Sequence, residues 1–274
     1  MFKNMEKEQK KINWFIGHMK KTVDVISEKK KNIDFVLEIV DSRLPNSSSN
    51  SELISIFSNK PIIKIALKSD LIDEKNKDKN LFYASIKNSK DKNRIVNYIN
   101  SCLEPKKQSF LKKGLKNPIF VGMVVGLPNI GKSSLINFLF NKKVLNVENR
   151  PGVTRKSENI KISDSLYLID TPGVFFKNVK TYEIGLNLAL INCVNRNLVN
   201  KKDLVIHLFD KILKNNQSFI FKKYFDIGYL NLSADEILIS ILEKNKTSKN
   251  NEETFFDFIL KKIIDDQEIK IYLD

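Results

Sequence analysis

The sequence predicts an α/β fold, in which a buried and mostly parallel sheet is followed by a small all-helical region. In roughly the first 170 residues, short apolar runs alternate with amphipathic stretches, which is the pattern of parallel strands covered by helices. After about residue 180, apolar residues recur at helical spacing and no strand signal is present. These two patterns of apolar residues indicate two structural parts in one chain.

Five apolar runs are predicted to be strands. Two of them, IDFVLEIV and IFVGMVV, are apolar almost throughout, as is typical of strands buried on both faces. A basic connector at residues 104–118 contains two prolines and one glycine, so we expect an exposed loop there. The predicted strands are Ile33–Val40, Pro61–Leu67, Leu81–Ala84, Ile119–Val125 and Leu166–Ile169, and helices are predicted near residues 51–58, 91–104 and 132–140.

The helical region is predicted from the spacing of its apolar residues. Ser233 to Glu236 have the pattern of a capping box before an apolar run, and a last helix is expected over Phe255–Ile264. We expect a sheet domain at residues 1–178 and a helical domain at 179–274. The two predicted helix faces before the capping box consist of Ile184, Leu188, Ile191, Val194 and Leu198, and of Leu204, Leu208 and Ile212.

The charge of the chain is unevenly distributed. The net charge is +15, yet residues 181–274 hold 13 Lys and Arg against 14 Asp and Glu, so the excess lies in residues 1–180. A positive field would speed encounter with RNA and make binding sensitive to salt. Only five basic residues are Arg, and heavy use of Lys, Asn and Ile is expected of an AT-rich genome whatever the function. Charge alone therefore supports RNA contact and a solvated lysine surface equally.

Several classes of protein are disfavoured by composition. The chain has no run of roughly eighteen apolar residues, and its first residues lack the apolar segment of a secretory signal. Cys102 and Cys193 lie 91 positions apart in apolar contexts, so we expect reduced core thiols rather than a disulfide or metal ligands. A cytoplasmic protein without membrane contact is expected.

A phosphate-binding loop is predicted at Gly126–Ser133. The sequence GLPNIGKS fits G-x-x-x-x-G-K-S, follows an apolar run and precedes an amphipathic segment. Glycines let backbone N–H groups approach phosphates, and the following helix N-terminus adds partial positive charge. Lys132 is expected to reach the β and γ phosphates, and the Ser133 hydroxyl to ligate Mg²⁺. An incidental glycine loop is the alternative, which the flanking strand and helix disfavour.

A second phosphate motif is predicted at Asp170-Thr-Pro-Gly173, 38 residues past Lys132. A carboxylate at a strand end beside the phosphate loop can hold Mg²⁺ through water, and the Gly173 N–H can bond the γ phosphate. Alone, this tetrapeptide would be an ordinary turn. Between the two motifs, RPGVTR supplies Thr154, a candidate second Mg²⁺ ligand on the basis of its position.

Base recognition is predicted from residues that come earlier in the chain. Lys68-Ser69-Asp70 follows the apolar run PIIKIAL and resembles the end of the guanine-reading motif N-K-x-D. An Asp carboxylate accepts from guanine N1–H and the exocyclic amine together, a donor pair that adenine lacks. Ser85, in the sequence Y-A-S-I-K, follows 15 residues after Asp70 and resembles the loop that backs the base. By itself K-x-D could equally be a surface ion pair.

The order of these motifs resembles that of the circularly permuted ribosome-assembly GTPases. In Ras-like GTPases the base-reading motifs follow the phosphate motifs, whereas here they precede them. The likeness is greatest to the ribosome biogenesis GTPase A family and covers most of residues 12–200. It is carried by W-F-x-G-H-M near the N-terminus, I-V-D-S-R-L-P at 39–45, N-K-P at 59–61, G-L-P-N-I-G-K-S, R-P-G-V-T and D-T-P-G.

The resemblance implies a permuted P-loop GTPase domain with a helical RNA-binding domain. It further implies a protein that acts on the large ribosomal subunit, its rRNA and its proteins, late in assembly, with GTP hydrolysis stimulated by the particle. The expected cofactors are Mg²⁺ and K⁺, with GTP as substrate and GDP as product. The expected GTP-binding residues are Lys68, Ser69, Asp70, Ser85, Asn129, Ile130, Gly131, Lys132, Ser133, Ser134 and Gly173.

The resemblance also suggests how water is activated. Ras-like enzymes orient the attacking water with a Gln after the D-x-x-G motif, but Val174 occupies that position here. The family suggests His18 of W-F-x-G-H-M instead, since a neutral imidazole can hold or activate water. A structural histidine is the alternative. The family's P-loop Asn, matched by Asn129, suggests a K⁺ ion that bridges the phosphates.

Three departures from the family pattern are visible. Leu67 stands where the base-reading motif has Asn, which we expect to cost about 1–2 kcal/mol of nucleotide affinity, as one lost hydrogen bond. Ile16 breaks the N-terminal motif's Gly-Pro tendency, with a mild expected effect. The last stretch of the near-neutral helical region barely matches the family's usual end, so RNA contact there has the least support.

The leading hypothesis is therefore a Mg²⁺-dependent GTPase, expected to be a monomer, that acts on the maturing large subunit. The alternative is a GTP-gated RNA-binding module that hydrolyses little. A GTPase of the small subunit is disfavoured, because the stretch before Trp14 is too short for an OB domain and no Cys/His cluster offers a zinc module.

Overall fold

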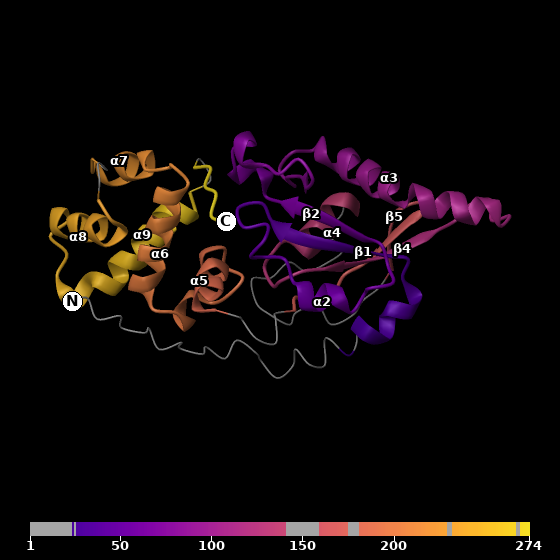
Figure 1. Ribbon diagram of the computed structural model, residues 1–274, viewed down its shortest axis with the longest axis horizontal. Coiled ribbons are helices and arrows are strands. Elements are labelled where there is room, and N and C mark those ends of the chain that lie inside the picture. The colour runs from indigo at the N-terminus through magenta and orange to yellow at the C-terminus, as the bar shows by residue number, and fades with distance from the viewer. Residues whose placement is uncertain (1–23, 25, 141–158, 175–180, 229–231, 267–268) are drawn as a thin grey trace, which may run out of the picture.

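The computed structural model describes residues 24, 26–140, 159–174, 181–228, 232–266 and 269–274. Its first part is a six-stranded sheet of order β3-β2-β1-β4-β6-β5 (Figure 1). Five strands are parallel, and β5 pairs antiparallel with β6 at the edge. The strands are β1 (Phe35–Asp41), β2 (Ile62–Leu67), β3 (Phe82–Tyr83), β4 (Phe120–Val125), β5 (Asn159–Ser163) and β6 (Leu166–Ile169).

Strand β1 lies between β2 and β4 and pairs in parallel with both. Val40 is opposite Ala66 of β2, and Glu38 is opposite Val125 of β4. Because all three strands run in the same direction, their carboxyl ends lie at one edge of the sheet. The loops after β2 and β4, which were predicted to bind base and phosphate, therefore begin at the same edge, on either side of β1.

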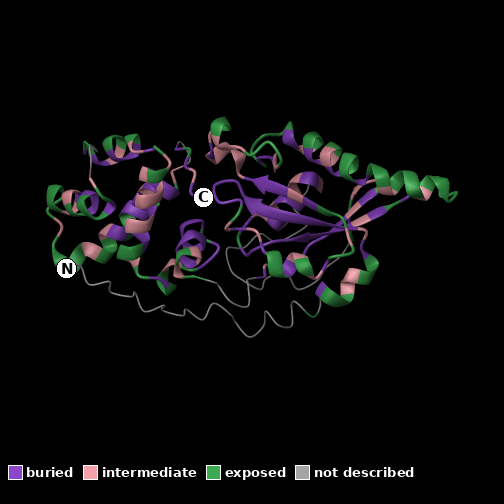
Figure 2. Cartoon of the chain, viewed as in Figure 1, coloured by how far each residue is buried: buried purple, intermediate pink, exposed green. Residues whose placement is uncertain are grey.

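Helices cover both faces of the sheet. Alternate residues of β1 point to opposite faces. Phe35, Leu37 and Ile39 share a buried cluster with α3 (Asp91–Lys112) and α4 (Lys132–Phe140), whereas Val36 shares another with α2 (Ser51–Ser55). All seven β1 residues are buried, which explains the nearly unbroken apolar run in the sequence (Figure 2).

The second part is a helical bundle, in which α6 packs against α5, α8 and α9 (Figure 1). The predicted capping box is confirmed, since Ser233 and Glu236 exchange hydrogen bonds at the start of α8. The α-helices are α5 (Tyr182–Leu190), α6 (Lys201–Lys214), α7 (Phe219–Phe225), α8 (Ala234–Lys244) and α9 (Glu252–Ile264). Short 3-10 turns are η1 (Lys30–Asn32), η2 (Ser69–Leu71), η3 (Glu74–Asn76), η4 (Arg196–Leu198) and η5 (Lys249–Asn251).

The predicted exposed loop at residues 104–118 is wrong over its first half. Helix α3 continues through Pro105 to Lys112. Proline removes one helical hydrogen bond, but side-chain contacts hold the helix beyond it. The ring of Phe110 stacks on Phe120 of β4 at 5.9 Å, and Lys106 Nζ donates to Asp34 at 2.7 Å. Tertiary contacts thus override the local signal.

The single helix face predicted through Leu198 is also wrong. Helix α5 ends at Leu190, because Asn192 adopts a left-handed backbone with φ of 58° and the Cys193 N–H turns back to the Leu188 carbonyl. Cys193 is buried as expected, but Cys102 is exposed on α3, contrary to the prediction of two core thiols. Strand β5 and helix α7 were not predicted.

Two further expectations bear on the whole chain. The predicted domain boundary at residues 178 and 179 falls outside the described residues. Within the described residues, every helix is too short or too polar to cross a lipid bilayer.

We predict that Gly122→Ala destabilises the protein by about 1–3 kcal/mol, as overpacking of a core does. A Cβ on Gly122 of β4 would lie 2.2 Å from the buried Phe35 ring. Chemical denaturation measures the effect. Gly228→Ala is the matched control, because a Cβ there has no atom of the described residues within 4 Å; equal stability of the two variants would contradict the packing described.

Candidate functional site

Two loops at the carboxyl edge of the sheet form the candidate site. The phosphate loop connects β4 to α4, and two of its glycines, Gly126 and Gly131, have φ of 153° and 113°. A Cβ on Gly126 would come within 2.6 Å of the Ile39 carbonyl oxygen of β1. Glycine is therefore required where the loop leaves the sheet, both for its backbone angle and for the close approach of β1.

One cavity of about 300 Å³ joins the phosphate loop to the predicted base-reading loops. Ser69, the middle residue of K-S-D, is not among its lining residues; its N–H donates to the Ala84 carbonyl and ties the two base-reading segments together. The cavity thus brings early and late segments of the chain to one place. It is lined by Leu67, Lys68, Asp70, Leu71, Ser85, Ile86, Lys87, Asn129, Ile130, Gly131 and Ser134.

Asp70 presents an ionised carboxylate at the cavity. Partial burial raises its pKa, but the hydroxyl of Ser85, which donates at 2.6 Å, and the ammonium of Lys87 at 3.0 Å lower the pKa more strongly, so the net pKa lies below its ordinary value. An ionised carboxylate accepts hydrogen bonds and donates none. This is the state that a guanine edge, with its two neighbouring donors, requires.

Lys68 is held by a buried carboxylate for which the sequence analysis gave no role. Asp41, at the end of β1 and fully buried, accepts from Lys68 Nζ at 2.8 Å and from Arg43 Nη2 at 2.9 Å. Burial raises the pKa of Asp41, but the two cations outweigh it and keep the carboxylate ionised. Lys68 has a left-handed backbone with φ of 63°, which is costly for a side chain other than glycine. In the sequence, Asp41 and Arg43 stand two positions apart in the I-V-D-S-R-L-P stretch, and this spacing was the signal that could have indicated their pairing.

Leu67, which replaces the expected Asn, contacts the phosphate loop through its side chain. Leu67 is buried in the main core, which is the cluster shared by β1, α3 and α4. Its Cδ1 lies 3.4 Å from where a Cβ on Gly131 would stand. The two loops are therefore joined here by apolar packing.

Lys132 lies inside the phosphate loop. Its Nζ donates to the carbonyl of Leu127 at 2.8 Å and to that of Gly126 at 3.1 Å. Burial lowers the pKa of Lys132 to about 8, although Asp170 opposes the shift. A phosphate beside this ammonium would favour the charged form.

Ser133 and Asp170 form an oxygen pair suited to Mg²⁺. The Ser133 hydroxyl donates to Asp170 Oδ2 at 2.6 Å, and Asp170 Oδ1 is buried without a hydrogen-bond partner among the described residues. Burial raises the pKa of Asp170 above its ordinary value despite the Ser133 bond and Lys132. A buried carboxylate oxygen in need of a partner, next to a hydroxyl, fits a hard cation that takes oxygen ligands.

The D-T-P-G turn packs directly on the phosphate loop. A Cβ on Gly173 would lie 2.5 Å from the backbone of Pro128, so only glycine allows this approach. The next side chain, Val174, is buried in the cluster beneath α2 and cannot orient water. Its carbonyl accepts from the Asn50 amide at 3.2 Å.

Four further side chains complete the comparison with the sequence analysis. Asn129 lines the cavity at an exposed position and donates through its amide nitrogen to the Asn192 carbonyl at 3.0 Å. His18 and Thr154 lie outside the described residues. His207 is half-buried and bonded to Asn187 at 2.7 Å, and burial lowers its pKa to about 4, as for a structural histidine.

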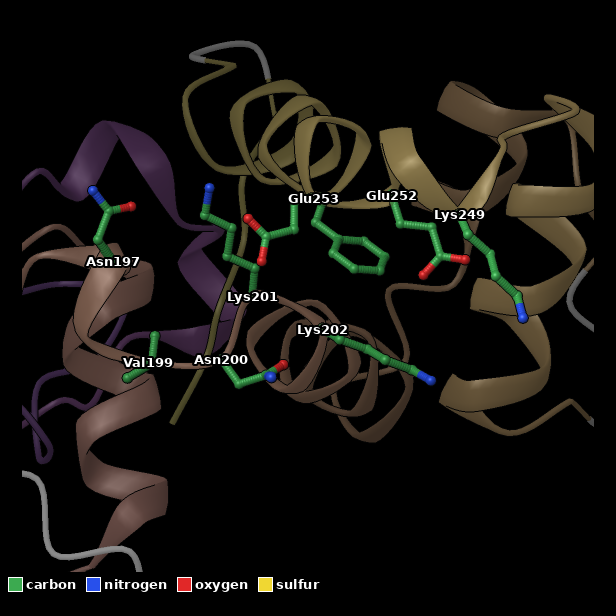
Figure 3. A pocket seen from close by; sticks show the side chains of 9 residues that line it. Asn197, Val199, Asn200, Lys201, Lys202, Lys249, Glu252 and Glu253 are labelled. Carbon is green, nitrogen blue, oxygen red and sulfur yellow. The ribbon is translucent and has the colours of Figure 1, made fainter.

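A separate cavity of about 490 Å³ lies in the helical part, where the N-terminal ends of α6 and α9 meet (Figure 3). None of the predicted site residues lines it. Lysines and glutamates both surround it, so its charge is mixed. The lining residues are Asn197, Val199, Asn200, Lys201, Lys202, Lys249, Glu252, Glu253 and Phe256.

Comparisons with known proteins show which family and which fold this chain resembles. A family model described as "50S ribosome-binding GTPase" matches residues 121–257. "Probable ribosome biogenesis GTPase A" of Mycoplasma genitalium is 41% identical over 210 residues, covering 77% of this chain and 78% of that protein. "Ribosome biogenesis GTPase A" of Priestia megaterium is 35% identical over 207 residues, covering 72% of each. A crystal structure of GNP-bound YlqF from T. maritima, 17% identical, has a TM-score of 0.57 and covers 93% of this chain and 97% of that one, which supports the fold alone.

We predict that affinity for GDP falls as the pH rises above 8, by up to about tenfold per pH unit. Lys132 has a pKa of about 8, below its unfolded value, so at higher pH the loop must take up a proton before it holds a phosphate. Titration of a fluorescent GDP analogue between pH 7 and 9.5 measures the slope. Guanine also loses its N1 proton at high pH, which weakens binding in any variant. Lys132→Arg stays charged throughout this range, so its slope measures the contribution of guanine alone. Equal slopes for both proteins would contradict the assignment.

Proposed function

This chain belongs to the ribosome biogenesis GTPase A family of GTP-hydrolysing enzymes, and we propose that it binds the maturing large ribosomal subunit with GTP and leaves after hydrolysis. The observation that carries the proposal is the single cavity shared by the base-reading loops and the phosphate loop. The family model, described by its binding to the 50S subunit, supports the choice of particle.

We assign the guanine base of GTP to that cavity and its phosphates to the phosphate loop that borders it. Asp70 accepts from the guanine edge, Lys68 packs along the base, and Ser69 and Ser85 hold the base-reading segments. The backbone from Asn129 to Ser134 and the Gly173 N–H bind the phosphates, with Lys132 at the β and γ positions. This division is supported by the ionised state of Asp70 and by the buried ammonium of Lys132.

Cations belong at the phosphate end. Ser133 and Asp170 would hold Mg²⁺, with Thr154 as a further ligand, and the ion would neutralise charge that develops on the phosphates. We assign K⁺ to the amide oxygen of Asn129. The phosphate loop and the end of β6 thus supply the oxygen ligands that we assign to these cations.

Hydrolysis adds water to the γ phosphorus and releases GDP and phosphate. Because the Val174 side chain is buried in the sheet's second core, another group must orient the water. We assign this role to His18. The positive charge of residues 1–180 supports contact with rRNA, and it includes Lys112 and Lys113 at the end of α3, which extends beyond the sheet (Figure 1). We propose a cytoplasmic monomer.

We predict that purified large subunits stimulate GTP hydrolysis by at least about tenfold, and that K⁺ supports more activity than Na⁺. Phosphate release is measured with the protein alone, with large subunits and with small subunits, in each salt. Small subunits are the matched control for polyanionic RNA. Stimulation by both particles, or by neither, would contradict the proposal that the large subunit is the partner.

The same assay distinguishes the alternative function. Tight GTP binding with no turnover under any condition would indicate a GTP-gated RNA-binding module. His18→Ala should abolish most of the stimulated rate without changing GDP affinity; wild-type turnover in that variant would remove His18 from catalysis.

Base recognition gives a separate prediction. Asp70→Asn should lower GTP affinity by about tenfold or more and raise the relative affinity for XTP, because xanthine carries a carbonyl where guanine carries the amine. Competition binding with GTP, XTP and ATP measures the preference. Asp164→Asn is the matched control, since Asp164 is an exposed aspartate paired with Lys161 and does not line the cavity. An unchanged preference in Asp70→Asn would refute this pocket.

A further inference from the structure

The last described residues, Ile269–Asp274, lie between the base-reading loops and the helical part (Figure 1). We call this segment the tail. Ile269, Ile271 and Leu273 are buried in the main core, whereas Lys270 between them is exposed and Tyr272 is half-buried on the opposite side. This alternation is typical of an extended strand, in which successive backbone groups also point to opposite edges.

One edge of the tail is hydrogen-bonded to the nucleotide site. The Ile271 N–H donates to the Leu71 carbonyl at 2.9 Å, and the Leu273 N–H donates to the Arg43 carbonyl at 2.9 Å. Leu71 directly follows Asp70 and lines the cavity. Arg43 shares the buried Asp41 carboxylate with Lys68. The tail therefore holds the backbone next to Asp70 and the backbone of Arg43, whose side chain shares Asp41 with Lys68.

The other edge is hydrogen-bonded to the helical part. Gln217, only 2% exposed, donates through Nε2 to the Lys270 carbonyl at 2.9 Å and accepts from the Tyr272 N–H at 3.1 Å. Asn215 donates to the Tyr272 carbonyl at 2.9 Å. Gln217 is thus a two-point anchor that fixes the tail's register against the loop after α6.

Side chains of the tail add contacts to the sheet part. The Asp274 carboxylate accepts from the Ser47 hydroxyl at 2.8 Å and from the Asn46 N–H at 2.6 Å. Tyr272 packs against a small buried cluster that contains Ala66 of β2 and Tyr83 of β3. The strands that carry the two base-reading segments are therefore also in contact with the tail.

We propose that the tail, anchored by Gln217, positions the base-reading loop, and so sets affinity and selectivity for the guanine base. The loop needs such support, because Leu67 replaces the Asn of N-K-x-D and Lys68 carries a left-handed backbone. The inference rests on the proposed role of Asp70. Coupling is reciprocal: a guanine nucleotide that fixes the loop also stabilises the tail.

The test is nucleotide binding and turnover by Gln217→Ala. Loss of both anchor bonds is expected to raise the Kd for GDP and the KM for GTP about tenfold, as roughly 1.4 kcal/mol would, with kcat unchanged. The preference for GTP over ITP, which lacks the exocyclic amine, should also fall. Asn245→Ala is the matched control, because Asn245 likewise donates its side-chain amide to a backbone carbonyl, that of Ile241, away from the tail.

Hydrogen exchange provides a second readout that lost stability alone would not produce. In the wild type, GDP should slow exchange of the Ile271 and Leu273 amides, and in Gln217→Ala this protection should disappear. Asp274→Ala is a milder change at the surface and should also raise the Kd for GDP. It serves as the test variant if Gln217→Ala fails to fold.

The outcomes separate this inference from the proposed function. If Gln217→Ala and Asp274→Ala both keep wild-type affinity and selectivity, and if GDP does not change hydrogen exchange in the tail, the positioning role is overturned. The proposed pocket stands in that case as long as Asp70→Asn still changes the base preference. An Asp70→Asn protein with unchanged base preference would instead remove the proposed pocket, and this inference with it.

Discussion

The parallel pairing of β1 with both β2 and β4 is the constraint on which the nucleotide site depends. A permuted chain must bring an early base-reading segment to a later phosphate loop, and shared strand direction achieves this, because all three carboxyl ends reach one edge. Gly126 shows how tight the arrangement is, since the β1 carbonyl of Ile39 leaves no room for a Cβ. The order of motifs along the chain thus matters less than the order of strands in the sheet.

Buried charge is the second organising feature of this edge. Asp41, Lys132 and Asp170 are all removed from water, and each has an opposite charge or polar group nearby. Burying a charge is costly unless it is paired. In the proposed function, Lys132 and Asp170 would meet a polyanionic ligand and its cations, and these contacts would offset the cost. Asp41 belongs to the scaffold, and its pairing with Arg43 stays inside the protein.

The sequence predicts much of the fold, because strongly apolar runs and phosphate motifs are local signals. Strands β1, β2 and β4 and helix α4 follow from such runs. Strand β5, N-I-K-I-S, is short and lies at an edge, where fewer apolar residues are needed, and α3 passes Pro105 because Phe110 and Lys106 find partners distant in sequence. The predicted Asp70 and Gly131 line one cavity, whereas the Asp41 pair and the tail required knowledge of long-range contacts.

The tail's extended conformation has a consequence for how this chain tolerates change. Its apolar residues repeat every second position, as I-K-I-Y-L shows, and its two edges serve different partners. An insertion of a single amino acid within the tail, between Ile269 and Leu273, would put the residues on its two sides out of phase, so that one set of apolar side chains turns to solvent and its amides lose their partners. An insertion of two would restore the alternation. Length changes within this segment should therefore favour even numbers.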